Sequence, residues 1–121
     1  MSVVEQYARA HIVTDADLAE EERSAVPVAL HYDPDEDPRT VRVGLPGGRE
    51  WSIARTLLEQ GLRAPAGSGE VRVWPCGRVQ AIVEFHSPQG VSVVQFESKA
   101  LLRFLRRTYT ATSPTGRQLT R

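Results

Sequence analysis

One stretch of 25 residues, from Trp51 to Pro75, constrains the fold more than any other part of the sequence. It reads W-S-I-A-R-T-L-L-E-Q-G-L-R-A-P-A-G-S-G-E-V-R-V-W-P. This order predicts a strand end, a short helix over residues 55–60, a bend rich in proline and glycine, and a strand over residues 70–75. Gly61 stands where a helix C-cap is expected. The stretch therefore predicts a domain in which strands and short helices alternate.

The segments around this stretch alternate between apolar and polar residues. That period-two pattern predicts five further strands, over residues 26–32, 40–45, 49–53, 79–86 and 91–97. Pro27 restricts the first of them to an edge position or to the start of its strand, because proline donates no hydrogen bond to the ladder. Residues 3–13 fit a strand or a short helix, and their last residues favour a strand.

A second helix is predicted after the last strand, with Ser98 as its N-cap. The helix has an apolar stripe at helical spacing, which consists of Leu101, Leu102, Phe104 and Leu105. The order of hairpin glycine, strand and helix with a Leu-Leu pair occurs twice along the chain. We therefore expect an α+β fold of two antiparallel sheets, with one main helix after each half. Residues 1–121 are expected to form one domain, with an acidic N-terminal part (1–25) and a flexible tail (110–121).

The net charge of zero hides an asymmetry between the two parts of the chain. Residues 1–38 hold ten acidic residues and two arginines, a net charge of −8, whereas residues 39–121 have a net charge of +8. Such a split is typical of a basic binding face, or of an acidic segment that covers one. It also fits two halves that neutralise each other across one folded surface.

Residue combinations typical of catalysis or cofactor binding are missing. His11, His31 and His86 lie on separate predicted strands, and Cys76 has no second cysteine to pair with. The G-x-G of residues 67–69 precedes a strand, whereas a phosphate-binding loop precedes a helix. We therefore expect no catalytic, metal or cofactor site. The single cysteine, and the absence of a signal sequence or membrane-length apolar run, favour a cytoplasmic protein.

Three arginines of the second predicted helix are the candidate functional residues. Arg103, Arg106 and Arg107 stand at positions i, i+3 and i+4, which places them on one face. Three interpretations stay open: a solvated helix face, a surface for a protein partner or anion, and a phosphate-binding surface for nucleic acid. The absence of interleaved aromatic residues counts against the third.

The stretch from Trp51 to Pro75 resembles the signature of the SsgA-like sporulation and cell-division proteins of actinobacteria. The matching residues are Trp51, Arg55, Leu57, Leu58, Gly61, Pro65, Gly67, Gly69, Val71, Arg72 and Pro75. The similarity extends through V-P-V-A-L-H-Y-D, S-P-Q-G and L-L-R-F-L-R-R-T, so it covers roughly residues 26–116. Glu70 replaces the aspartate that is usual in the family.

The resemblance implies a non-enzymatic regulator of sporulation-specific cell division that positions or recruits the septum machinery through protein contacts. It implies a whirly-like fold, a homo-oligomer that is a trimer, and no catalytic residue. The implied partners are cell-division proteins such as the tubulin-like division GTPase or septum-localising factors. The implied location is the cytoplasm, with recruitment to division septa. The alternative is a single-stranded nucleic-acid-binding module that uses the basic C-terminal half.

Overall fold

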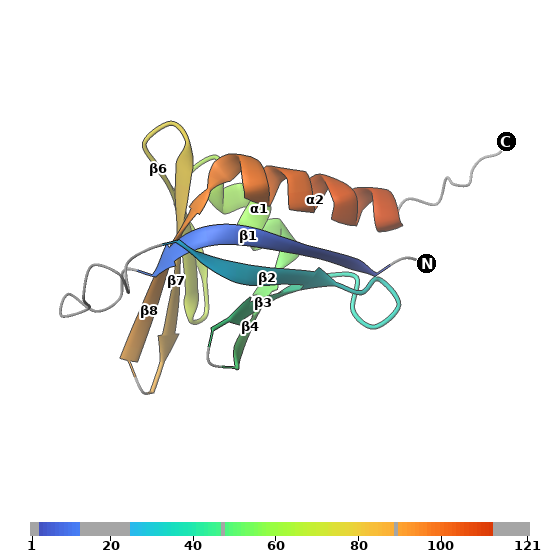
Figure 1. Ribbon diagram of the computed structural model, residues 1–121, viewed down its shortest axis with the longest axis horizontal. Coiled ribbons are helices and arrows are strands. Elements are labelled where there is room, and N and C mark those ends of the chain that lie inside the picture. The colour runs from blue at the N-terminus through green and yellow to red at the C-terminus, as the bar shows by residue number, and fades with distance from the viewer. Residues whose placement is uncertain (1–2, 13–24, 47, 89, 113–121) are drawn as a thin grey trace, which may run out of the picture.

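The computed structural model describes residues 3–12, 25–46, 48–88 and 90–112. The elements in this part of the chain are β1 (Val4–Ile12), β2 (Val26–Tyr32), β3 (Thr40–Leu45), β4 (Arg49–Ala54), α1 (Arg55–Gly61), β5 (Ala66–Ser68), β6 (Val71–Cys76), β7 (Gln80–Ser87), β8 (Gly90–Glu97) and α2 (Ser98–Thr112). The strands form one antiparallel sheet in the order β4-β3-β2-β1-β8-β7-β6-β5 (Figure 1). Helix α2 lies along β1, on the opposite side from β2–β4 in the view of Figure 1.

The expectation of two separate antiparallel sheets is wrong, because β1 joins the two halves. Its residues Val4 to Ala10 pair with β2, and Ala10 to Ile12 pair with β8. Nine residues make β1 long enough to reach both neighbours. The sequence pattern leaves these residues undecided between strand and helix, so the link between the halves is not visible in it.

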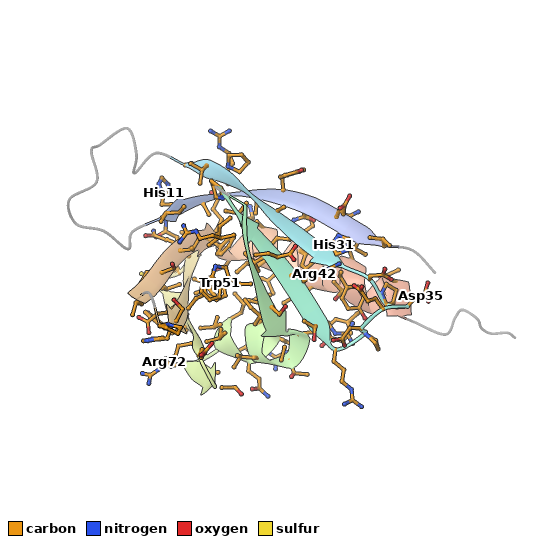
Figure 2. All side chains as sticks on the ribbon, turned by 90° about the horizontal axis from the view of Figure 1, so that it is seen from below. His11, His31, Asp35, Arg42, Trp51 and Arg72 are labelled. Atoms are coloured by element: carbon orange, nitrogen blue, oxygen red, sulfur yellow. The ribbon has the colours of Figure 1, made fainter. Side chains whose placement is uncertain are left out.

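The sheet curls so that its two halves face each other across the core. Trp51 on β4, which is labelled in Figure 2, stacks on Phe85 of β7, with ring centroids 4.6 Å apart. These strands are not neighbours in the sheet, so this contact requires the sheet to bend. The alternating pattern of β2 predicts four inward residues, of which Val28, Leu30 and Tyr32 are fully buried and Val26, at the start of the strand, is half-buried. Full burial of one such side chain contributes about 1.5–3 kcal/mol to stability.

Gly61 has a packing role and not the capping role expected from the sequence. Helix α1 ends at Gly61, and its C-cap residue is Leu62. Gly61 is buried against β6, where an added Cβ would lie 2.3 Å from the Cβ of Val73. A glycine at this position lets the helix backbone approach the strand closely.

Several element bounds differ from the sequence expectations. Strand β5 lies within the segment expected to be a loop, and α2 continues through Thr112, into the range assigned to the tail. Pro27 is the second residue of β2, which lies between β1 and β3, so the start-of-strand alternative holds. The acidic segment at residues 13–24 and the end of the tail, residues 113–121, lie outside the described residues.

Candidate functional site

The orientation of α2 determines which of its side chains face solvent. Leu101, Phe104, Leu105 and Thr108 are buried beneath the helix. The Thr108 hydroxyl donates a hydrogen bond to the carbonyl oxygen of Leu105 at 2.7 Å, which satisfies this polar group in the core. These positions follow i, i+3, i+4 and i+7, so the opposite face of the helix is directed away from the protein.

The structure brings the three candidate arginines together on that exposed face. Arg103, Arg106 and Arg107 are all exposed. They line a hollow of about 520 Å³, the arginine groove, whose other lining residues are Val3, Val4, Thr110 and Ala111. The groove is therefore formed by the end of α2 and the beginning of the chain, which the sequence places about 100 residues apart.

Arg107 also fastens the helix to the sheet. Its Nη1 atom donates hydrogen bonds to the backbone oxygen of Glu5 and to Oε1 of Gln6, both at 3.2 Å. The Gln6 side chain donates in turn to the backbone oxygen of Ala100 at 3.0 Å. Within residues 3–12, 25–46, 48–88 and 90–112, the guanidinium groups of Arg103 and Arg106 take part in no hydrogen bond or ion pair. Among the three groove arginines, these two are therefore the ones whose charge no described residue uses.

The exposed side of α2 is cationic and partly apolar. The helix carries Arg103, Arg106, Arg107 and Lys99, and it has no acidic residue. Leu102 is 45% exposed on this side, and Val3 beside the groove is 49% exposed. The expectation that Leu102 belongs to the buried stripe is therefore wrong. Positive charge beside exposed apolar side chains suits a surface that is both acidic and apolar.

A second cluster connects α1, α2 and β2 around Arg55. The guanidinium carbon of Arg55 lies 3.9 Å from the ring centroid of Tyr109 and 5.2 Å from that of Tyr32. Arg55 Nη1 donates hydrogen bonds to the Tyr32 hydroxyl at 3.1 Å and to the Thr108 backbone oxygen at 3.4 Å. Arg55 therefore holds both helices and the sheet together.

The Tyr109 hydroxyl belongs to the same cluster. It donates a hydrogen bond to Oε1 of Glu59 at 2.9 Å. Burial, and then the hydrogen bond and negative charge of Glu59, raise the pKa of Tyr109 above its usual range. One face of the Tyr109 ring contacts Arg55 and its hydroxyl contacts Glu59, so this aromatic residue is already used within the fold.

Two larger hollows lie elsewhere on the surface. One, of about 630 Å³, is next to Arg72, Trp74 and Glu84, and Figure 2 shows Arg72 well away from His31 and Arg42. The other, of about 570 Å³, lies between the start of β4 and the hairpin of β7 and β8, and includes Trp51. In neither hollow do the lining side chains form a combination with an evident catalytic role.

The sequence-based candidates for chemistry stay apart in the structure. His11, His31 and His86 lie on β1, β2 and β7, and Cys76 is exposed at the end of β6. His31 contacts Glu5 at 3.1 Å, and His86 contacts Glu84 at 2.6 Å. In the part of the chain that the structure describes, no group of three or more His, Cys, Asp or Glu side chains is placed to hold a metal ion. Within the same residues, neither helix has the length and apolar character needed to span a bilayer.

Comparison with known proteins gives consistent matches. Residues 26–117 match a family model described as Streptomyces sporulation and cell division protein, SsgA. The chain is 41% identical over 101 residues to the sporulation-specific cell division protein SsgB of Kineococcus radiotolerans, which covers 77% of this chain and 60% of that protein. It is also 41% identical over 96 residues to SsgB of Frankia casuarinae, which covers 71% of this chain and 66% of that protein. The matches thus span less than two thirds of either relative.

A solved structure supports the fold. The structure comes from work on SsgB mutations that correlate to longitudinal cell division during sporulation of Streptomyces coelicolor. The TM-score is 0.78 with 34% sequence identity, and the match covers 95% of this chain and 90% of that one. The curled sheet with two helices is therefore shared with a protein of known structure.

Proposed function

Because this chain belongs to the SsgA family of sporulation and cell division proteins, we propose that it acts in sporulation-specific cell division as a non-enzymatic protein that binds a protein partner through the arginine groove. The names of its relatives support the division role. The observation that supports the arginine groove as the contact site is the exposed face of α2. This face has four cationic side chains and no acidic one, next to the exposed residues Leu102 and Val3.

The partner in this proposal is a component of the septum machinery with an acidic surface. The tubulin-like division GTPase and factors that localise the septum are the candidates. The protein acts in the cytoplasm as a homo-oligomer, a trimer in this proposal, and is recruited to division septa. Charge complementarity between the groove and an acidic partner speeds association and selects against basic surfaces.

A nucleic-acid-binding role is the second candidate, and the cationic face of α2 favours it. Against it, a single-strand platform normally combines positive charge with free aromatic faces. The exposed aromatic residue of α2 is Tyr109, which is close in sequence to the groove arginines. The guanidinium group of Arg55 lies over its ring. The protein contact therefore explains this face better than nucleic acid does.

The test replaces the native gene in a sporulating host with the Arg103→Glu/Arg106→Glu variant. We expect loss of sporulation septa at normal protein abundance, because neither arginine side chain bonds to another residue in the described part of the chain and both are exposed. The matched control is Arg63→Glu/Arg78→Glu, a reversal of two exposed arginines outside the groove. Normal septation in the groove variant contradicts the proposal. Micromolar single-stranded DNA or RNA binding that the groove variant loses favours the second candidate.

A further inference from the structure

The hollow of about 570 Å³ between two hairpins shares no lining residue with the arginine groove. One wall is the start of β4, with Arg49, Glu50 and Trp51, and the other is the β7–β8 hairpin, with Ser87 and residues 90–92. Figure 1 shows the β3–β4 and β7–β8 hairpins extending to the same side of the molecule. We propose that this hollow binds the C-terminal carboxylate of an extended peptide segment of another protein. The site is separate from the groove, so it goes beyond the function proposed above.

Hydrogen-bond donors meet at this hollow. The exposed Arg49 donates a single long hydrogen bond from Nη1, of 3.4 Å, to Oγ of Ser92 on β8. The indole Nε1 atom of Trp51 is buried and has no acceptor among the residues that the structure describes. A buried N–H group without a partner is unfavourable, so an acceptor that a ligand brings is stabilised there. A guanidinium, an indole N–H and a hydroxyl match the two oxygen atoms of a carboxylate.

Binding requires a small side-chain shift at this wall, because Nε1 of Trp51 is itself covered. Arg49 is the side chain that can make it, since it is exposed and held by one long bond. The carboxylate then replaces Ser92 as the main partner of the guanidinium. A charged acceptor forms a shorter and stronger bond to arginine than a hydroxyl does.

The hollow lies along the edge of β4. Its lining residues Arg49, Glu50 and Trp51 are consecutive, and successive side chains of a strand point to opposite faces. A hollow lined from both faces lies beside the strand backbone. β4 is the end strand of the sheet, and β3 pairs with one of its edges along all six residues. No strand within the described residues pairs with the other edge, so its N–H and C=O groups can pair with an added strand.

The position of Arg49 determines the direction of the added strand. Arg49 is the first residue of β4, so an antiparallel strand that terminates here brings its C-terminus to the guanidinium. A parallel strand would bring its N-terminal ammonium group to the same place, where the guanidinium repels it. The charge of Arg49 therefore selects an antiparallel strand with a free C-terminal carboxylate.

The walls of the hollow also select the last residues of the ligand. Val91 is 39% exposed there, and Gly90 has no side chain to fill the space, so we expect a small apolar residue at the C-terminus. In the antiparallel pairing, the residue before it lies opposite Glu50. Like charges directly opposite each other are destabilising, so an acidic residue is disfavoured at this position.

The experiment is an NMR titration of the protein with two acetylated peptides of sequence K-T-V-T-S-V. One peptide ends in a free carboxylate and the other in an amide, and their lysine disfavours the arginine groove. We expect the free acid to bind at least about tenfold more tightly than the amide. It should shift the indole N–H resonance of Trp51 and slow the amide exchange of residues 49–52. The Trp51 resonance is assigned by its loss in Trp51→Phe.

Three variants test the residues of the hollow. Arg49→Gln should bind the free acid about tenfold more weakly and no longer distinguish it from the amide. Trp51→Phe keeps an aromatic ring against Phe85 but loses the N–H donor, and should bind about threefold to tenfold more weakly. The matched control is Arg78→Gln, which changes an exposed arginine in the turn between β6 and β7 and should bind as wild type does.

Equal binding of the acid and the amide by wild type, or binding of neither at millimolar peptide, overturns the inference. So does N-acetylvaline binding as tightly as the peptide, because the site then takes a small carboxylate without an added strand. Arg103→Glu/Arg106→Glu should bind the peptide normally, and loss of binding in this variant would place the carboxylate in the groove and overturn the inference. If wild type binds no peptide while this groove variant still abolishes sporulation septa, the inference fails and the proposed function stands.

Discussion

The guanidinium group of Arg55 lies against the ring of Tyr109, 3.9 Å from its centroid, and so joins the short helix α1 to the end of α2. Arg55 also reaches the hydroxyl of Tyr32 on β2. Arg55 and Tyr109 are 54 residues apart in the sequence, and their contact gives the arginine that directly follows β4 a role in the fold. The same end of α2 carries the arginine groove, so the Arg55 cluster sets where the groove arginines lie.

We expect Arg55→Lys to lower the free energy of unfolding by about 1–3 kcal/mol. A lysine keeps the charge but loses the flat surface that lies on Tyr109 and the donor geometry that reaches Tyr32 and Thr108. Urea unfolding followed by circular dichroism measures this change, with Arg63→Lys at an exposed position as the control. A double-mutant cycle with Tyr109→Leu isolates the ring contact, and a coupling energy near zero would contradict the interpretation.

The raised pKa of Tyr109 predicts a loss of stability at high pH. The folded state holds the phenolic proton more tightly than the unfolded state, whose tyrosine titrates at about 10.0. The contribution is therefore fully present below the unfolded pKa and is lost as pH rises through the folded pKa. Urea midpoints measured from about pH 8 to 11 should fall more steeply for wild type than for Tyr109→Phe. Parallel curves for the two proteins would show that Tyr109 does not contribute.

The fold is only partly visible in the sequence, and β1 shows why. Val4, Ala8 and Ala10 point into the core, but Tyr7 on the opposite face is 75% exposed. Large apolar residues on both faces blur the period-two pattern, so the segment resembles a helix as much as a strand. Strand β2 has no large apolar residue on its outward face, so its sequence predicts both that it is a strand and which of its faces points inward. The strand that joins the halves is thus the one with the weakest local signal.

Only one wall of the candidate site, the one formed by the arginines of α2, could be predicted from the sequence. Helical spacing alone places Arg103, Arg106 and Arg107 on one face. The pattern i, i+3, i+4 and i+7 also separates Leu102 from the buried stripe, once Thr108 is included as its last member. The opposite wall of the groove comes from Val3 and Val4, and no local pattern links them to a helix 100 residues later.

Gly61→Ala should be strongly destabilising, by about 2 kcal/mol or more. The added Cβ would lie 2.3 Å from the Val73 Cβ and 2.9 Å from the Val73 backbone oxygen, so α1 would have to move away from β6. Gly44→Ala is the matched control, because its Cβ would meet the Ala29 Cβ at 3.4 Å, an ordinary contact. Thermal unfolding should show a large decrease in Tm for the first variant and little for the second. Equal shifts would mean that the close approach of α1 and β6 is not needed for stability.

The neighbouring residues Leu101 and Leu102 should respond very differently to truncation. Leu101 is 1% exposed beneath α2, so Leu101→Ala leaves a cavity and should cost about 2–4 kcal/mol of unfolding free energy. Leu102 is 45% exposed on the side of the helix that faces away from the core, so Leu102→Ala should cost less than about 1 kcal/mol. Chemical denaturation of both variants measures the difference. If the two losses were equal, α2 would be rotated about its axis relative to the orientation described above, and the groove arginines would no longer share one exposed face.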